Sequence, residues 1–594
     1  MSWAHLQQAW ADWLVDGLVA AGVRHVVVSP GSRSAPLALA VARAEAAGRL
    51  EAAVVADERS AGFVALGQGR MTGRPSVLVC TSGTAGAHYY PAVIEASESG
   101  VPLLAITADR PFELQARGAN QTVDQLGLFG RHVRACFELG LADPDPEAAA
   151  ALPRTAGRAV QACLAPDPGP VHLNVRFRKP LEAAGNDPPE VRALRGRVSA
   201  GLERGLPAPR PARALPDPAS LDELAVRLRR ARRGIVVAGP ASPSDAVSAA
   251  AVERFLEASG FVLLPEATSQ LRFGGPPARL VCDAFEPLFA PGPGRRPLEP
   301  DFVLQVGAAP SGRALAAWLA GESAPERVVL ARRGWPEAFN RAADLLVADP
   351  AAALLGLAER LPGAAPEADW AARASAASGA AWKRLDALLA ERAGFPEARA
   401  VQVAVDAVPE GGLLALGNSL PVREVDLFCP ASPRSLSVLS QRGASGIDGL
   451  VSSAAGAVLA SGFPAILLVG DVSFQHDVGG LAAARDLPGP LAVVVLRNGG
   501  GRLFDLLPVR ALAGADAAFR RFFLTPPAVG AADAARAFGI PAREAASADE
   551  LADALREAMG RDGATVVEAR VDGEATAEIV SALTGTAGGG GKVA

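Results

Sequence analysis

Cysteine is scarce in this chain of 594 residues, and its five copies are odd in number and widely spaced. No CxxC pair or metal-ligand spacing occurs, which excludes a disulfide framework and suits a reducing cytoplasm. A charge excess is also absent, because 58 basic residues against 63 acidic ones leave a net charge of −5. No overall field therefore attracts nucleic acid or acidic membranes, and any anion site must depend on local basic clusters.

We expect no targeting or membrane segment either. The N-terminal segment carries Asp12 and Asp16 on an amphipathic pattern and lacks the basic start and apolar core of a signal peptide. An uncharged stretch, 450–470, has about the length of a membrane span, but Gly462 and Pro464 divide it. We therefore expect a buried helix followed by a strand there, no membrane insertion, and a cytoplasmic location.

What is present is a long α/β pattern. Half of the residues are hydrophobic and 20% are charged, enough for several large cores. Short apolar runs that alternate with helical segments predict mostly parallel sheets flanked by helices. Composition changes divide the chain into blocks, which we place at 1–185, 216–365 and 380–585, with a linker at 186–215 and a disordered tail at 586–594. The middle block lacks GxGxxG after a strand, so it need not bind a dinucleotide.

Two polar loops in the third block predict a metal and diphosphate site. GDVS, which begins at Gly470 and includes Asp471 and Ser473, directly follows the apolar run AILLV. NGGG follows the run LAVVVL, and its Asn498 and Gly500 come 27 and 29 residues after Asp471. A carboxylate, an amide oxygen and a backbone carbonyl at neighbouring strand ends suit Mg²⁺, or Mn²⁺, bound together with phosphate oxygens. Either loop alone would be no more than a polar turn.

One acidic residue stands out in the first block, where Glu58 follows the run Ala52 to Ala56. That run suits a buried parallel strand, and Phe63, Val64 and Leu66 suit a helix that packs on the sheet. An acid at this point could simply stabilise the start of the helix through the macrodipole. Ligands also bind beyond the carboxyl ends of parallel strands, so a functional role stays open.

Several motifs in sequence order give the chain a specific resemblance. They are SPGSRSAPL, ADERSAGFVALG, TSGTA with YPAVIEA, TADRP, GANQTVDQLGLFG, GNSLPVREVD, RGASGIDGLVSSAAG and LFDLLP. Together with GDVS and NGGG they resemble the 2-succinyl-5-enolpyruvyl-6-hydroxy-3-cyclohexene-1-carboxylate synthase family of thiamine diphosphate enzymes. The match is dense in the first and third blocks, and covers the second only by general layout.

The resemblance implies a fold, a cofactor and a reaction. It makes 1–185 a pyrimidine-binding domain, 216–365 a central Rossmann-like domain and 380–585 a diphosphate-binding domain. It implies thiamine diphosphate with Mg²⁺ or Mn²⁺, decarboxylation of 2-oxoglutarate, and addition of the resulting succinyl carbanion equivalent to isochorismate in menaquinone biosynthesis. Because the family joins its first and third domains across subunits, it also implies a homodimer or a dimer of dimers.

The resemblance also assigns roles to individual residues. Glu58 would contact the aminopyrimidine ring, and Ile447 would support the bent cofactor. Arg33 and Gln121 would act with Glu58 at the reacting centre. Because both substrates are dianions, arginines and polar side chains in the matched motifs would bind them: Ser32, Arg33, Arg110, Asn120, Gln121, Ser419, Arg423 and Arg442. Phe504 would line the substrate pocket, although core packing suits it nearly as well, and Arg313 in the second block is a weaker candidate.

Three departures from the family pattern bear on fine substrate contacts. His88, Gln441 and Arg497 each stand where the family more often has asparagine, and His88 suits a core histidine slightly better than a site contact. Two other readings of the whole chain stay open. One is a different thiamine diphosphate-dependent 2-oxoacid decarboxylase or carboligase, and the other is a non-catalytic homologue. The second should lack the glutamate or the metal ligands, and Glu58, Asp471 and Asn498 are all present.

Overall fold

The computed structural model describes residues 2–202, 205–290, 298–512 and 516–584. These residues form two compact units, which are described separately below. The first contains the chain up to Ala212 together with Gln441–Gly462 and Gly479–Ala484, and the second contains the remainder. The expected tail, 586–594, lies outside the described residues.

The first unit is built on a six-stranded parallel sheet in the order β2-β1-β3-β4-β6-β5. Its strands are β1 (His25–Val28), β2 (Glu51–Val54), β3 (Ser76–Cys80), β4 (Leu103–Asp109), β5 (Ala135–Glu138) and β6 (Pro170–Arg176). Its helices are α1 (Trp3–Ala20), α2 (Ala35–Ala46), α3 (Glu58–Thr72), α4 (Ala85–His88), α5 (Tyr90–Ser99), α6 (Pro146–Leu164), α7 (Pro189–Leu202), α16 (Leu450–Ser461) and α18 (Leu481–Ala484).

The second unit contains two further parallel sheets. One has the order β11-β10-β9-β7-β8 and the other β13-β12-β14-β15-β17-β16. The five-stranded sheet consists of β7 (Gly234–Ala238), β8 (Val262–Pro265), β9 (Phe302–Val306), β10 (Glu326–Ala331) and β11 (Asp344–Val347). The six-stranded sheet consists of β12 (Leu413–Leu416), β13 (Ser437–Ser440), β14 (Ala465–Gly470), β15 (Pro490–Arg497), β16 (Ala542–Ala545) and β17 (Gly563–Arg570).

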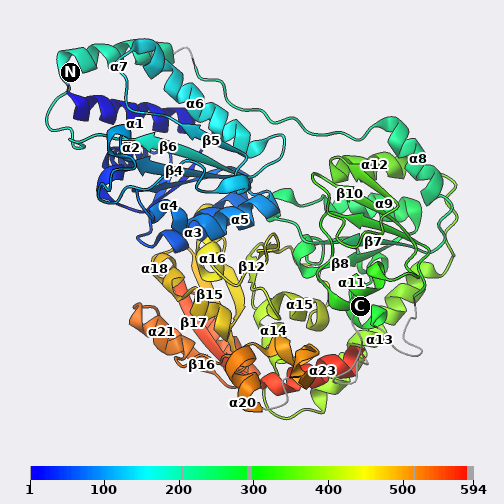
Figure 1. The fold of residues 1–594 in the computed structure, drawn as a ribbon. Helices are drawn as coiled ribbons and strands as arrows, with labels where there is room; N and C mark the ends of the chain where they lie inside the picture. Colours follow the sequence, from blue (N-terminus) through cyan, green and yellow to red (C-terminus); the bar gives the residue numbers. More distant parts are fainter. Residues whose placement is uncertain (1, 203–204, 291–297, 513–515, 585–594) are drawn as a thin grey trace. The chain divides into compact units, whose positions relative to one another are not determined.

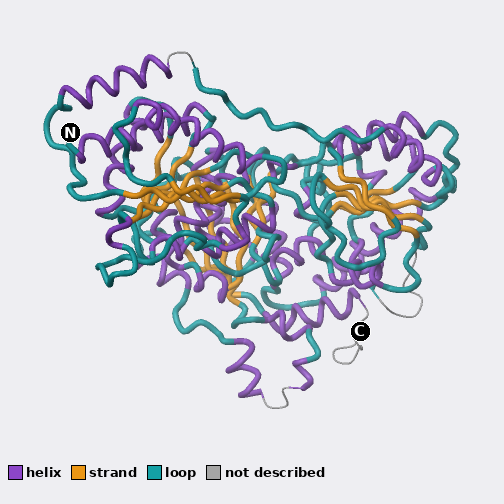
Figure 2. Tube along the Cα trace, turned by 45° about the horizontal axis from the view of Figure 1, so that its top comes forward, coloured by secondary structure: helices purple, strands orange, loops and turns teal. Residues whose placement is uncertain are grey.

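Helices accompany these two sheets, as Figures 1 and 2 show. They are α8 (Pro218–Leu228), α9 (Ala249–Ser259), α10 (Phe285–Phe289), α11 (Arg313–Ala320), α12 (Pro350–Arg360), α13 (Trp370–Ala390), α14 (Glu397–Asp406), α15 (Pro421–Phe428), α17 (Asp471–His476), α19 (Val509–Leu512), α20 (Asp516–Phe519), α21 (Ala531–Ala537), α22 (Ala548–Met559) and α23 (Gly573–Thr584). Three parallel sheets flanked by helices confirm the predicted α/β fold.

The central strands are buried because both faces of each sheet are covered. The strands β3, β4, β12 and β15 are apolar runs, with only the last residue of β15 exposed. Strand β2 differs from the prediction of a buried strand, because it forms the edge of its sheet and Val54 is 73% exposed. A short apolar run does not reveal whether one or two neighbouring strands flank it.

The structure also places a helix in the segment expected to be a linker. Val191, Leu194 and Val198 of α7 are buried in the hydrophobic core of the first unit. Their spacing is that of one helix face, a signal that the surrounding proline and arginine residues obscured. The uncharged stretch 450–470 is, as expected, the helix α16 followed by the strand β14. In the described part of the chain, no helix has the length and apolar character needed to cross a membrane.

Helices α3 and α16 cross at unusually close range within the first unit, and Figure 1 shows α16 in yellow beside α3. A Cβ atom added to Gly67 would lie 2.0 Å from the carbonyl oxygen of Ser453, and one added to Gly456 would lie 2.0 Å from that of Val64. Both neighbours are backbone atoms, so no side chain could move aside. The two glycines therefore set the distance between these helices.

We predict that Gly67→Ala destabilises the protein by about 1–3 kcal/mol, because the new methyl group overpacks this crossing. Replacing glycine by alanine inside a helix normally stabilises it by roughly 0.5–1 kcal/mol. The control is Gly196→Ala in α7, where an added Cβ meets nothing within 4 Å. Thermal unfolding followed by circular dichroism compares the two variants, and equal stability would contradict the close crossing.

Candidate active site

The predicted metal ligands lie past the ends of two paired strands in the second unit. Strands β14 and β15 pair in parallel, with Gly470 opposite Leu496, so Asp471 and Asn498 follow at the same edge. Both side chains are buried. Asp471 Oδ2 accepts hydrogen bonds from the N–H groups of Gly499 at 3.2 Å and Gly500 at 3.0 Å. The GDVS and NGGG loops are therefore joined directly, as their spacing predicted.

Electrostatics at this edge favour a positive partner for Asp471. Burial raises the pKa of its carboxyl group, against the opposing effect of hydrogen bonds from the backbone of Val472, Gly500 and Gly499. A bound cation would favour the ionised form. Ser473, the next polar residue of GDVS, is also buried, in the short helix α17 that Gly470 precedes as N-cap.

Asn498 presents an oxygen atom that suits a metal. Its Nδ2 donates to Glu397 Oε1 at 3.0 Å, whereas its buried Oδ1 accepts no hydrogen bond from any residue that the structure describes. An orphaned buried oxygen is rare in native proteins and points to an absent ion or water. A carboxylate and an amide oxygen are ligands that Mg²⁺ prefers, so the residues present fit such an ion.

Gly500 completes the predicted ligand set. Its φ of +116° favours glycine, and an added Cβ would lie 2.1 Å from the carbonyl oxygen of Leu524. Its own carbonyl accepts a hydrogen bond from Arg502 N at 2.7 Å, and a carbonyl has a second lone pair for a metal.

The GNSL loop follows β12, the strand next to β14, and so reaches the same edge. Ser419 has a φ of +73°, and its carbonyl accepts a hydrogen bond from the Arg423 guanidinium at 2.5 Å. A positive φ in a residue other than glycine is a strained conformation that clusters at functional sites. Gln121 and Ser445, in two other matched motifs, share this feature.

Phe504 and Arg313 also lie near these loops. Phe504 is half-buried and packs edge-on against Phe523, with ring centroids 5.4 Å apart. Arg313 Nη1 donates to the Leu506 carbonyl at 2.7 Å, which connects the second block to the LFDLLP motif. Arg497, the last residue of β15, pairs with the buried Glu568 of β17.

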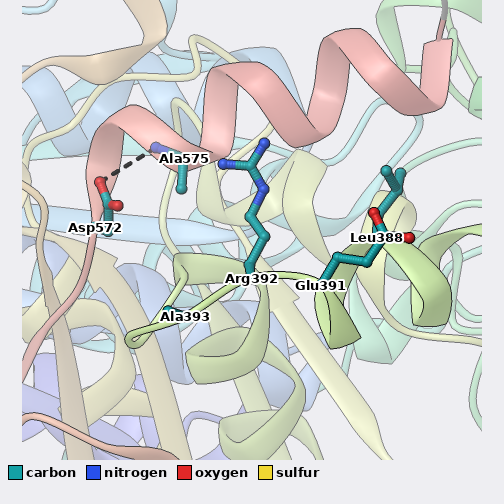
Figure 3. A pocket seen from close by; sticks show the side chains of 6 residues that line it. All are labelled: Leu388, Glu391, Arg392, Ala393, Asp572 and Ala575. Carbon is teal, nitrogen blue, oxygen red and sulfur yellow. Dashed lines mark hydrogen bonds between the residues drawn. The ribbon is translucent and has the colours of Figure 1, made fainter.

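Two cavities of about 380 Å³ each occur in the second unit. One is lined by Asp471 and Gly499 together with Arg497, Arg520 and Glu568, so it reaches the metal motif. The other lies between the end of α13 and the start of α23 (Figure 3). In it Asp572 already accepts a hydrogen bond from the N–H of Ala575, and no predicted site residue lines it.

In the first unit, the predicted substrate arginines follow β1 and β4, the two strands that flank β3, and lie close enough for their charges to interact. Arg33 comes after β1 and Arg110 directly after β4, and both are buried. Burial lowers the pKa of each guanidinium group, and the charge of Arg110 lowers the pKa of Arg33 further. Arg33 Nη1 donates to the Phe177 carbonyl at 2.7 Å, while its buried Nε has no partner among the described residues. The charge of Asp109 opposes these shifts in both arginines, and the two adjacent cations can attract a dianion.

Polar groups surround this arginine pair. Arg110 donates to Ser82 Oγ, and Gln121 Nε2 donates to the Ser82 carbonyl at 2.9 Å. Ser32, Asn120 and Gln121 are exposed. The TSGTA loop after β3 thus connects Arg110 to the GANQ motif. The family resemblance assigned substrate binding to residues of both.

Glu58 is the first residue of α3, past the end of β2. Asp57 caps this helix, since its side chain accepts a hydrogen bond from Arg59 N at 2.9 Å. The half-buried carboxylate of Glu58 makes no hydrogen bond or ion pair with any described residue. Its neighbour already caps the helix, so Glu58 is not needed as a cap, while its place in the first turn still lets its charge stabilise the helix start through the macrodipole.

The loop that carries Arg442 and Ile447, both half-buried, is fixed by a residue that the sequence did not single out. Buried Glu95 accepts hydrogen bonds from the N–H groups of Gly443 at 2.9 Å, Ala444 at 2.7 Å and Ser445 at 3.3 Å. Arg70 donates to the same carboxylate at 2.7 Å. One feature of the sequence could have identified Glu95. It is an acidic residue inside the matched motif YPAVIEA, and the helical pattern of that motif does not require an acid there.

The structure shows the surroundings of His88 and Gln441, two of the residues that depart from the family pattern. His88 is exposed at the end of α4, so its interpretation as a core histidine is wrong. No residue that the structure describes covers that short helix end enough to bury it. Gln441 is buried and donates to the Gly449 carbonyl at 3.2 Å, which closes the loop that contains Arg442.

Comparison with known proteins identifies two cofactor-binding domains in the chain. The thiamine pyrophosphate enzyme N-terminal TPP binding domain matches residues 9–128, and the C-terminal TPP binding domain matches residues 428–569. Curated 2-succinyl-5-enolpyruvyl-6-hydroxy-3-cyclohexene-1-carboxylate synthases are similar over nearly their whole length. That of Sorangium cellulosum is 45% identical over 96% of this chain and 94% of its own.

The synthase of Myxococcus xanthus is 39% identical over 97% of this chain and 96% of its own. That of Halorubrum lacusprofundi is 39% identical over 96% and 95%, respectively. Similarity of this extent, together with the two cofactor-binding domains, leaves one conclusion: the chain belongs to the 2-succinyl-5-enolpyruvyl-6-hydroxy-3-cyclohexene-1-carboxylate synthase family of thiamine diphosphate-dependent enzymes.

Proposed function

We propose that this enzyme decarboxylates 2-oxoglutarate and joins the remaining succinyl unit to isochorismate. The products are carbon dioxide and 2-succinyl-5-enolpyruvyl-6-hydroxy-3-cyclohexene-1-carboxylate, a step of menaquinone biosynthesis. The observation that carries this proposal is the buried pair Arg33 and Arg110 in a protein of net charge −5. Two adjacent cations repel each other. The nearby carboxylate of Asp109 offsets part of this repulsion, and a dianionic substrate would offset the rest.

Arg33 and Arg110 hold substrate carboxylates through their planar guanidinium groups. Arg423 and Arg442 add positive charge, with Arg423 held by the strained Ser419. Gln121, placed by its bond to Ser82, orients the reacting substrate together with Ser32 and Asn120. Phe504 supplies an apolar wall.

Asp471, Asn498 and the Gly500 carbonyl hold Mg²⁺ or Mn²⁺, which in turn binds the cofactor's diphosphate. Ser473 and the backbone of Gly470 belong to the same diphosphate-binding loop. Thiamine diphosphate, when bound, supplies the electron sink that a 2-oxoacid needs in order to lose carbon dioxide. Glu58 would hold a proton at the aminopyrimidine ring, and Ile447 would support the bound cofactor. We also propose a cytoplasmic homodimer or dimer of dimers.

The decisive experiment measures carbon dioxide release from 2-oxoglutarate by the purified protein with thiamine diphosphate and Mg²⁺. We expect release that depends on the cofactor and rises sharply when isochorismate is added. Release indifferent to isochorismate would indicate another 2-oxoacid decarboxylase, and no release under any condition would indicate a non-catalytic homologue.

Glu58→Gln should lower turnover by roughly 10²–10⁴-fold, the usual effect of losing a positioned acid–base group. Thiamine diphosphate affinity, measured by calorimetry, should stay within about threefold, because the diphosphate site is untouched. Asp57→Asn is the matched control, since it removes the adjacent charge and keeps a capping side chain. Near-normal turnover in Glu58→Gln would refute the role of this carboxylate.

Asp471→Ala should abolish retention of thiamine diphosphate and Mg²⁺, because it removes the only carboxylate of the proposed ligand set. The exposed Asp486, which pairs with Arg485, gives the control Asp486→Ala. Calorimetric titration with the cofactor compares the two. Unchanged affinity in Asp471→Ala would count against the metal site while leaving the substrate assignment standing.

A further inference from the structure

Glu397 is a buried carboxylate that the proposed chemistry leaves unused, and it lies behind the metal motif. It is the first residue of α14, fully buried, and more than 100 residues from Asn498 in sequence. Its two oxygens accept one hydrogen bond each. Oε1 accepts from Asn498 Nδ2 at 3.0 Å, and Oε2 accepts from Thr576 Oγ1 in α23 at 3.0 Å.

These bonds decide which way the Asn498 amide faces. An amide has an acceptor oxygen and a donor nitrogen of nearly the same size, and only its partners distinguish the two orientations. A hydrogen-bond acceptor on one side of the amide binds its nitrogen, so the amide oxygen faces the other side. In the structure that oxygen is buried and has no partner among the described residues.

The neighbouring backbone makes the arrangement tight. The carbonyl of Asn498 accepts a hydrogen bond from Arg502 Nε at 2.9 Å. A Cβ added to Gly573, at the start of α23, would lie 2.8 Å from the Cβ of Asn498. The backbone of Asn498 is therefore held from two sides, and rotation of its amide is the main freedom that remains.

We propose that Glu397 is a positioning residue for the metal: it holds the Asn498 amide so that Oδ1 is directed to the ion. Thr576 holds the second oxygen of Glu397 and so fixes the carboxylate. This inference rests on the proposed metal site and deepens it, because it names the group that prepares one ligand before the ion arrives. Groups behind a metal ligand commonly change metal affinity by about 10–100-fold.

A second buried glutamate supplies the matched control. Glu424 in α15 is as deeply buried as Glu397, and neither of its carboxylate oxygens has a hydrogen-bond partner among the described residues. The two carboxylates are close enough for the charge of Glu397 to raise the pKa of Glu424, although burial is the larger cause. Changing Glu424 therefore perturbs the same core without removing a hydrogen bond of Asn498.

The test is a titration of the full-length protein with Mn²⁺ in saturating thiamine diphosphate, with free Mn²⁺ measured by electron paramagnetic resonance. Glu397→Met removes the acceptor at similar side-chain length and should weaken Mn²⁺ binding by about 10–100-fold. Glu397→Gln keeps a carbonyl oxygen for Asn498 Nδ2 and should stay within about threefold of the wild type. Glu424→Met should stay within the same range.

Several outcomes would overturn the inference. Wild-type affinity in Glu397→Met would show that the amide needs no such support. Equal losses in Glu397→Met and Glu424→Met would show a general effect of the core, and an equal loss in Glu397→Gln would show that charge, not an acceptor, is required. If Glu397→Met does not fold, Glu397→Asp retracts the carboxylate by one methylene, and wild-type affinity there has the same meaning.

The same titration separates this inference from the proposed function. Failure of the wild type to bind Mn²⁺ with thiamine diphosphate would contradict the metal site itself, and the inference with it. If the wild type and all variants bind Mn²⁺ with the same affinity, only the role of Glu397 is overturned, and the metal site stands.

Discussion

Parallel strand pairing is the constraint on which the candidate site depends. In a parallel ladder all strands end at the same edge, so loops that are distant in sequence begin side by side. The pairing of β12 with β14 and of β14 with β15 brings GNSL, GDVS and NGGG to one edge. In the other unit, β1, β3 and β4 do the same for Arg33, the TSGTA loop and Arg110. Because each ladder is buried, its register cannot slip without exposing apolar residues.

Buried carboxylates serve as anchors for the loops at these edges. Glu95 fixes the backbone that carries Arg442, and Glu397 fixes the side chain of Asn498. Both are fully surrounded by protein and accept hydrogen bonds on both oxygens. A buried charge is costly unless it is compensated, so such a group persists where its bonds hold a loop in one conformation.

Local charge and backbone strain both occur in loops of the matched motifs. The chain is acidic overall, yet Arg33 and Arg110 are buried next to each other at the carboxyl edge of a sheet. Gln121, Ser419 and Ser445 have positive φ values in matched motifs, each at an energetic cost of about 1–3 kcal/mol. The packing of the rest of the fold, including the close crossing of α3 and α16 at their glycines, offsets the conformational free energy that these residues cost.

The sequence by itself determined the α/β class, the strand ends that carry polar loops and the family, because apolar runs, turn residues and motifs are local features. It correctly placed a helix and a strand in 450–470, and it placed Asp471 and Asn498 at neighbouring strands. Strand order decided that β2 is an edge strand, and packing decided that α7 joins a core and that His88 is exposed. The anchoring roles of Glu95 and Glu397 were also beyond the sequence. Their bonds span 348 and 101 residues, and only tertiary structure brings such distant groups within hydrogen-bonding distance.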